Sequence, residues 1–226
     1  MASRDDRINP RRPDPRLYLV SPKVADAAAF AGTLTAALAG AALAGAEVAA
    51  VLLRLEAPDE RSLINIAKAL APLIQSAGAA CLIAGHPDIV ARAGADGAHL
   101  TGIDAFSAAA RAALQPERIA GCGGLTTRHD AMLAAEAGAD YVLFGEPDQA
   151  GHRPSPEAVA ERVTWWAEIF EPPCVGYAGT LAEVAALAAA GADFVAVGDC
   201  IFADGRGPAA ALADAAQHLA LPEAVE

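Results

Sequence analysis

The amino-acid sequence predicts a single-domain α/β fold, a (β/α)8 or TIM barrel, from three observations. An Ala-Gly-Ala phrase followed by a mostly apolar run occurs five times, beginning at Ala44, Ala77, Ala93, Ala137 and Ala190. Eight apolar runs alternate along the chain with stretches of helical composition. The chain has 226 residues, of which 54% are hydrophobic and 19% charged, which suits one large core better than two.

The repeated phrase has a physical interpretation as a junction between a helix and a strand. Its glycine ends an Ala-rich stretch, where glycine tolerates the left-handed conformation that closes a helix. The residues that follow are apolar and often β-branched, as a parallel strand buried on both faces requires. These glycines are Gly45, Gly78, Gly94, Gly138 and Gly191.

The predicted elements follow one another in a regular order. The expected strands are Leu17 to Val20, Val48 to Leu53, Ala80 to Ala84, Gly97 to Leu100, Ile119 to Gly121, Tyr141 to Gly145, Cys174 to Tyr177 and Phe194 to Val197. The expected helices are Val24 to Ala44, Glu60 to Ala77, a short one after Pro87, Phe106 to Leu114, Arg128 to Ala137, Pro156 to Ile169, Leu181 to Ala190 and Pro208 to Leu219. Eight such pairs favour the barrel. A doubly wound open sheet is the alternative, but Ser21-Pro22-Lys23 is not the Gly-rich turn that such sheets carry after the first strand.

Composition excludes several classes of partner. The formal net charge is −12, and the only basic run is RINPRRPDPR near the amino terminus, so no nucleic-acid surface is expected. The stretch from Ala25 to Ala46 contains Asp26 and several small or polar residues, so it is a poor membrane span. We therefore expect a cytoplasmic protein, a possible homodimer, with a disordered arm over residues 1–15 and the barrel over residues 16–221.

The four cysteines carry no metal-binding spacing. Cys81, Cys122, Cys174 and Cys200 each lie in or beside an apolar run, which predicts buried, reduced thiols.

In a barrel of this kind, the site is expected on the loops that follow the strands. Gly179 follows the seventh strand, and Gly198 and Asp199 follow the eighth. Glycine lets backbone N–H groups approach an anion, and a following helix adds its positive end. These three residues are therefore the predicted phosphate-binding residues, with tight turns as the alternative explanation for the glycines.

Five motifs follow one another between Arg16 and about Pro208: RLYLVS, LLR, GADGAHLTGID, GADYVLFG and AGADFVAVGDCIF. In this order of motifs, the chain resembles the thiamine phosphate synthase and thiazole tautomerase family. The resemblance implies an enzyme that joins a pyrimidine pyrophosphate to a thiazole phosphate with Mg²⁺ and releases pyrophosphate.

The resemblance carries over only some of the family's functional residues. Arg54 matches a catalytic arginine of the second loop, and Asp104 matches one of two metal carboxylates. Ala84 and Gly85 replace the other carboxylate, while Gly123 and Leu125 replace a serine and a histidine of the fifth loop. The glutamine and lysine of the second loop and the Thr-x-Thr-Lys clamp of the sixth have no counterpart. This pattern predicts weak or altered synthase activity.

Asp199 adds a further departure, because it stands where the family offers a hydroxyl. A carboxylate about 4 Å from a bound phosphate would repel it by several kcal/mol near a protein surface. Asp199 would then turn away, or the ligand is not a phosphate.

Two other function classes are compatible with the sequence. An isomerase or tautomerase on the same barrel would use His152, Glu146 or His86, which follow strands on the site face and could exchange protons. A non-catalytic binding or assembly protein would keep only the fold. His99, within the fourth strand, is interpreted as a packed core residue.

Overall fold

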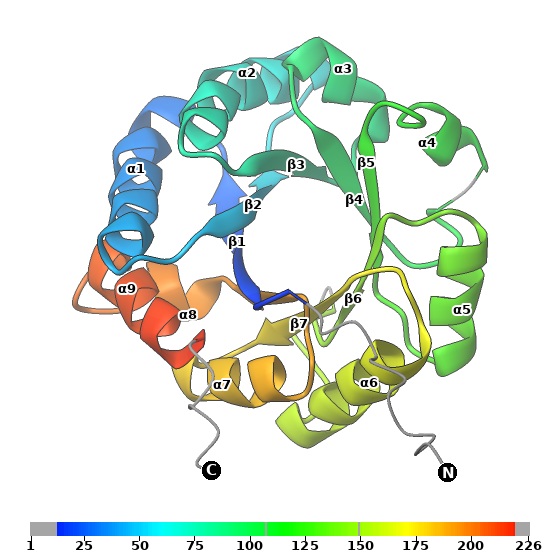
Figure 1. The fold of residues 1–226 in the computed structure, drawn as a ribbon. Coiled ribbons are helices and arrows are strands. Elements are labelled where there is room, and N and C mark those ends of the chain that lie inside the picture. Colours follow the sequence, from blue (N-terminus) through cyan, green and yellow to red (C-terminus); the bar gives the residue numbers. More distant parts are fainter. Residues whose placement is uncertain (1–12, 107, 149, 220–226) are drawn as a thin grey trace, which may run out of the picture.

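The structure is a computed structural model that describes residues 13–106, 108–148 and 150–219. Its strands form a closed parallel barrel in which each strand pairs with the next and β8 pairs with β1 (Figure 1). The strands are β1 (Arg16–Val24), β2 (Val48–Leu55), β3 (Ala80–Ala84), β4 (Gly97–Thr101), β5 (Ile119–Gly123), β6 (Tyr141–Phe144), β7 (Cys174–Ala178) and β8 (Phe194–Val197). The predicted (β/α)8 barrel is confirmed, and the alternative of an open sheet is wrong.

Helices surround the barrel and connect its strands (Figure 1). They are α1 (Ala27–Leu43), α2 (Glu60–Ser76), the 3₁₀ turn η1 (Pro87–Ile89), α3 (Val90–Ala93), α4 (Ala108–Ala112), α5 (Arg128–Glu136), α6 (Pro156–Ile169), α7 (Leu181–Ala189), α8 (Asp199–Phe202) and α9 (Pro208–Leu219). No helix in the described ranges is both long and apolar enough to cross a membrane. Most of the predicted arm, residues 1–12, lies outside the described residues.

Most element boundaries agree with the predictions to within two residues, and the main differences concern the end of β1 with the start of α1, the fourth helix, and α8. Val24, where the sequence predicts the start of a helix, instead ends β1, because that strand continues its pairing with β2 as far as Leu55. The helix begins at Ala27, since the Asp26 carboxylate accepts hydrogen bonds from the first backbone N–H groups. The fourth helix spans only Ala108–Ala112, and the short helix α8 was not predicted.

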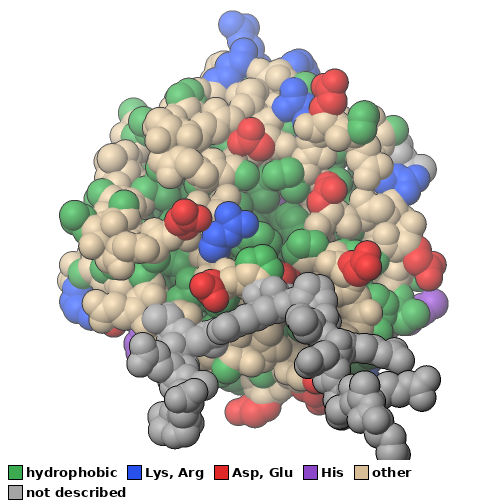
Figure 2. All heavy atoms as spheres, viewed as in Figure 1, with side chains coloured by type: hydrophobic (Ala, Val, Ile, Leu, Met, Phe, Trp, Pro, Cys, Tyr) green, Lys and Arg blue, Asp and Glu red, His purple; other side chains and the backbone are tan. Residues whose placement is uncertain are grey.

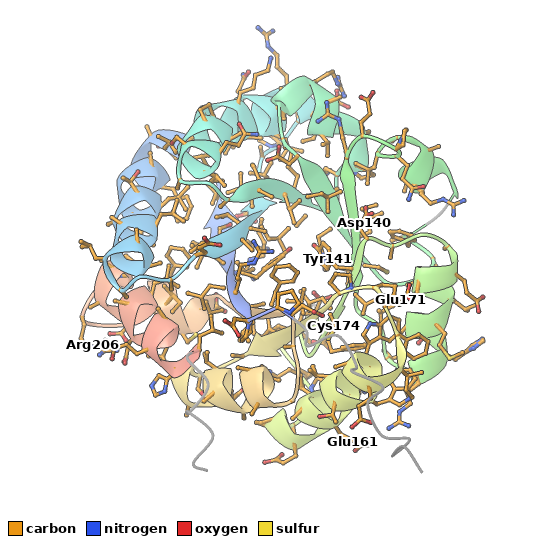
Figure 3. The ribbon with its side chains drawn as sticks, in the orientation of Figure 1. Asp140, Tyr141, Glu161, Glu171, Cys174 and Arg206 are labelled. Atoms are coloured by element: carbon orange, nitrogen blue, oxygen red, sulfur yellow. The ribbon has the colours of Figure 1, made fainter. Side chains whose placement is uncertain are left out.

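The core has two layers, one outside the strands and one inside the barrel. The outer layer packs strands against helices and holds most of the buried aliphatic side chains. The inner layer includes Tyr18, Leu52, Leu82, Tyr141 and Tyr177. Figure 3 places Tyr141 inside the ring of strands, with Glu161 and Arg206 on the outside. The lumen is therefore filled by side chains, as in other barrels of this class.

The repeated phrase forms the predicted junctions. All five of its glycines have positive φ, from 71° at Gly94 to 92° at Gly138 and Gly191, and each follows a helix directly before a strand. In three copies the phrase continues into an aspartate, which bonds to the first residues of the preceding strand. The Asp140 carboxylate accepts the Ala120 N–H at 2.7 Å, while the Asp140 N–H donates to the Ala120 carbonyl.

The cysteines agree with the prediction of reduced thiols. Cys81, Cys122 and Cys174 are buried, Cys200 is half-buried, and none forms a disulfide. Burial raises the pKa of the Cys81 and Cys122 thiols to about 12, so both stay protonated at neutral pH.

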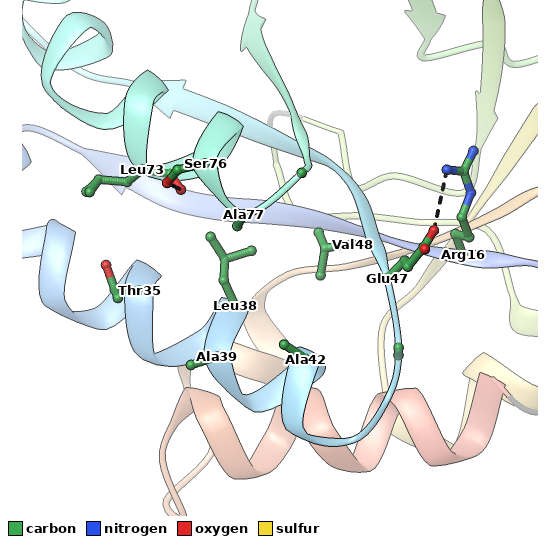
Figure 4. A pocket seen from close by; sticks show the side chains of 12 residues that line it. Arg16, Thr35, Leu38, Ala39, Ala42, Glu47, Val48, Leu73, Ser76 and Ala77 are labelled. Carbon is green, nitrogen blue, oxygen red and sulfur yellow. Dashed lines mark hydrogen bonds and ion pairs between the residues drawn. The ribbon is translucent and has the colours of Figure 1, made fainter.

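Cavities lie at the end of the barrel where the strands begin. Figure 2 shows a hollow there, lined mainly by hydrophobic side chains, and it corresponds to a cavity of about 190 Å³ that includes Tyr18 and Phe194. A groove of about 540 Å³ lies between α1 and α2 beside the Arg16–Glu47 ion pair (Figure 4). Although this groove is larger than the others described, it is at the wrong end for the loops that carry function in such barrels.

Candidate functional site

Arg54, at the end of β2, is held in place at the mouth of the barrel. Its backbone N–H donates to Ser21 Oγ at 3.0 Å, and its Nε donates to the Ser21 carbonyl at 2.5 Å. Its terminal nitrogen lies 3.1 Å from Asp199 Oδ1. One third of the Arg54 side chain, 34%, remains exposed. The guanidinium is therefore fixed in position but still open to a ligand.

Asp199 is brought to the mouth by the short turn after β8. Gly198 precedes α8, and its carbonyl accepts the N–H groups of Ile201 and Phe202. The Asp199 side chain points to Arg54 and remains well exposed. Two residues that the sequence singled out for different roles thus form one ion pair, which partly neutralises the carboxylate expected to repel phosphate.

Gly179, the other predicted cradle residue, has its N–H engaged within the protein. It donates to Glu183 Oε2 at 2.9 Å. Arg153 from the loop after β6 holds both Glu183 oxygens, at 3.1 and 2.8 Å. Burial raises the pKa of Glu183, but hydrogen bonds from Arg153 and Gly179 outweigh burial and leave this pKa below its usual value. A protein carboxylate therefore accepts the bond that a phosphate would take.

His152 lies at the rim of the mouth, away from Arg54. Its side chain is 83% exposed, and its Nδ1 is 3.6 Å from Asp148 Oδ2. The backbone N–H of His152 also donates to Asp148. These contacts shape the loop after β6, and the structure does not bring His152 together with the other predicted catalytic residue.

Asp104, the predicted metal ligand, is exposed on the loop after β4. Within the described parts of the chain, no three His, Cys, Asp or Glu side chains lie close enough together to hold a metal ion. Mg²⁺ sites usually combine one or two carboxylates with substrate phosphates and water. A lone exposed carboxylate does not amount to a built Mg²⁺ site, so no chemical step is assigned to a metal here.

A polar chain inside the barrel is the main feature that the sequence did not predict. His99 is buried, as expected, but both ring nitrogens have partners: Nδ1 lies 2.9 Å from the Tyr141 hydroxyl and Nε2 3.1 Å from Glu146 Oε2. Tyr18 extends the chain through a 2.8 Å contact with the Tyr141 hydroxyl. The signal available in the sequence is a polar histidine within a predicted strand, three positions before the loop residue Gly102.

A pocket of about 430 Å³ opens beside this chain, between the loops after β4, β5 and β6. Glu146 forms part of its wall, with His152 and Asp148 at one side. The other lining residues are Thr101, Gly124, Leu125, Thr126, Gly145, Pro147, Arg153, Pro154 and Arg162. The mouth therefore offers two distinct regions, one around Arg54 and Asp199 and one around Glu146.

Comparison with known proteins assigns the family. The sequence profile described as thiamine monophosphate synthase matches residues 17–201. The chain belongs to the thiamine monophosphate synthase family. Among curated members of this family, the thiamine-phosphate synthase of Rhodospirillum centenum is 42% identical over 204 residues, which are 89% of this chain and 96% of that one. The thiamine-phosphate synthase of Hyphomonas neptunium is 36% identical over 209 residues, 89% of this chain and 92% of that protein.

Solved structures agree with the fold of the family. A thiamine phosphate pyrophosphorylase from Pyrococcus furiosus superimposes with a TM-score of 0.72 at 19% identity, covering 92% of this chain and 96% of that one. A 3-hexulose-6-phosphate synthase from Salmonella typhimurium gives a TM-score of 0.67 at 16% identity, covering 90% and 98%. At these identities the likeness concerns the barrel alone, because one barrel supports many reactions.

Proposed function

We propose that this family member binds a small phosphorylated ligand at the mouth formed by the loops after β2, β7 and β8, and that its turnover as a thiamine-phosphate synthase is weak or altered. The observation that carries the proposal is the fixed guanidinium of Arg54, on a side chain that is one-third exposed. A planar guanidinium is well suited to phosphate oxygens. The ligand would take the Arg54 N–H groups that face the mouth.

The charges around Arg54 support the second half of the proposal. Asp199 holds one Arg54 nitrogen at 3.1 Å, and Glu183 holds the Gly179 N–H at 2.9 Å. Arg153, the cation of the loop after β6, is committed to Glu183 and to the Tyr177 carbonyl. Donors that would stabilise charge developing on a leaving pyrophosphate are thus already satisfied by protein groups, which lowers the expected rate.

Calorimetry with inorganic phosphate and with the thiazole phosphate tests binding at this mouth. The wild-type protein should bind weakly, and Asp199→Ser should bind more tightly because it removes a negative charge and releases an Arg54 donor. Glu161→Gln removes the same charge from the outer surface of α6 and should leave binding unchanged. Absence of binding by both the wild type and Asp199→Ser would contradict the proposal.

A second candidate function rests on the contact between Glu146 and His99. A carboxylate hydrogen-bonded to an imidazole at the wall of a pocket is a common arrangement for moving protons, which an isomerase or tautomerase requires. Such an enzyme would lose activity in Glu146→Gln and keep it in Arg54→Gln, whereas a synthase would depend on Arg54.

A further inference from the structure

A hollow remains at the end of the barrel where the strands begin (Figure 2). This floor hollow is the cavity of about 190 Å³ that includes Tyr18 and Phe194. Two inward positions beside it, Ala50 and Ala80, carry only a methyl group, whereas bulky branched side chains usually fill the layers inside such barrels. The hollow therefore follows from the sequences of β2 and β3, and it lies apart from the mouth around Arg54.

The wall of the floor hollow is apolar. Tyr18 and Tyr141 line it, but their hydroxyls lie 2.8 Å from each other, and the Tyr141 hydroxyl is 2.9 Å from His99 Nδ1. Burial raises the pKa values of both tyrosines well above the usual value, so neither carries a charge at neutral pH. Because these hydroxyls already have partners, the tyrosines, Leu82 and Val175 offer a ligand mainly apolar contact.

Arg16 is the charged residue among the described residues that line the floor hollow. Its Cζ atom lies 5.1 Å from the centre of the Phe194 ring, and 48% of its side chain is exposed. Its Nη1 atom is 3.9 Å from Glu47 Oε2, which is too far for a hydrogen bond. Such a surface ion pair contributes little to stability, so the guanidinium of Arg16 keeps donors that a ligand can use.

The carboxylates at the starts of nearby strands are engaged with the backbone. Asp96, Asp140 and Asp193 each accept a backbone N–H group of the preceding strand at 2.7 or 2.8 Å, and none of the three is among the described lining residues. Aromatic rings also attract cations, but the guanidinium over Phe194 already takes that position and would repel a second cation. The charge at the hollow is therefore positive, which favours an anion.

We propose that the floor hollow binds a small hydrophobic carboxylate, of the size of a monocyclic aromatic acid, with its apolar body in the hollow and its carboxylate on Arg16. An apolar protein cavity of about 150 Å³ accepts benzene, so one ring fits the space. A guanidinium pairs with a carboxylate through two parallel hydrogen bonds. This site uses the starts of the strands, so the proposal holds whether or not phosphate binds beside Arg54.

Benzoate, benzyl alcohol and benzamidinium test the proposal, because they are similar in shape and differ in charge. Titration calorimetry should show benzoate binding to the wild-type protein, with the alcohol and the amidinium weaker by roughly tenfold or more. Arg16→Gln should weaken benzoate binding by a similar factor. Arg92→Gln is the matched control: Arg92 is 53% exposed and pairs with Glu60 away from the hollow, so this variant should bind as the wild type does.

Fluorine nuclear magnetic resonance of protein labelled with 3-fluorotyrosine locates the bound probe. The chain has three tyrosines, whose signals are assigned by their loss in the single Tyr→Phe variants. Benzoate should shift the signals of Tyr18 and Tyr141, which line the floor hollow, more than that of Tyr177, which is not among the described lining residues.

Four results would overturn the proposal. They are no benzoate binding, equal benzoate binding by Arg16→Gln, binding of benzyl alcohol or benzamidinium as tight as that of benzoate, and a shift confined to Tyr177. The third result would assign the hollow to a neutral or cationic ligand, and the fourth would place benzoate at the other end of the barrel. None of these readouts depends on synthase activity or on phosphate binding.

Discussion

The guanidinium of Arg54 lies 3.1 Å from the carboxylate of Asp199, which joins the loops after β2 and β8 across the mouth of the barrel. Arg54 is also fixed by two contacts to Ser21 at the end of β1. Three strands that are neighbours in the barrel thus converge on one cation. Asp199 therefore orients the guanidinium, but it also occupies one of its donors and offsets part of its positive charge.

Replacing Arg54 by glutamine should weaken binding of the thiazole phosphate. A hydrogen bond to a charged group contributes about 1.5–3 kcal/mol, which corresponds to roughly a tenfold to hundredfold loss of affinity. Arg128→Gln, which breaks an ion pair with Glu161 on the outer surface, is the matched control and should bind normally. Calorimetric titration of both variants gives the comparison, and equal affinities would remove Arg54 from the site.

Replacing Gly138 or Gly191 by valine should destabilise the fold by more than about 1 kcal/mol, since valine resists positive φ. Both glycines have φ of 92°. Gly32→Val is the control, because Gly32 lies within α1 with open space around it and lacks this conformation. Thermal unfolding should show lower midpoints for Gly138→Val and Gly191→Val, and an unchanged midpoint for Gly32→Val. Midpoints unchanged from the wild type in both would contradict the junction interpretation.

Introducing alanine at Gly123 should cost about 1–3 kcal/mol through overpacking against Glu146 and His99. Removing the Glu146 side chain should relieve part of that cost. The free energy of unfolding of Gly123→Ala, Glu146→Ala and the double variant forms a cycle that measures the coupling. Additive effects would mean that the close approach of residue 123 to Glu146 has no energetic consequence.

Glu183 should make the wild-type protein more sensitive to acid than its Glu183→Gln variant. The pKa of Glu183 is lowered in the folded state, so the unfolded chain takes up its proton first as the pH falls. The stability contribution is therefore complete above the unfolded pKa, whose ordinary value is 4.5, and is lost as the pH drops through the folded pKa. Urea unfolding of both proteins between about pH 6 and pH 3 gives the free energy of unfolding at each pH. This free energy should fall more steeply with decreasing pH for the wild type than for Glu183→Gln.

The fold could be predicted from the sequence because its determinants are local and repeated. Each junction combines a glycine at positive φ with an apolar run, and both signals fall within ten residues. The predicted bounds of Ala80–Ala84, Phe194–Val197 and Pro156–Ile169 agree with the structure. The local sequence around Val24 does not predict a strand, because β1 extends there by pairing with β2, an interaction between residues that are distant in sequence.

The site was less predictable, because it depends on which loops meet. The sequence indicated Arg54 and Asp199 separately, but their pairing follows from the closure of the barrel between β8 and β1. His99 resembled a core residue, since its neighbours in β4 are apolar. Its contact with Glu146 requires the loop after β6 to return over the lumen, and the space at Gly123 to receive both side chains.

The rate at which the purified protein forms thiamine phosphate tests the central proposal most directly. The assay supplies both precursors with Mg²⁺, beside a thiamine-phosphate synthase that has both metal carboxylates and the clamp of the sixth loop. Each lost contact to developing charge commonly lowers a rate by about a hundredfold, so this chain should turn over at least about a hundredfold more slowly. A comparable rate that Asp104→Ala abolishes would contradict the account.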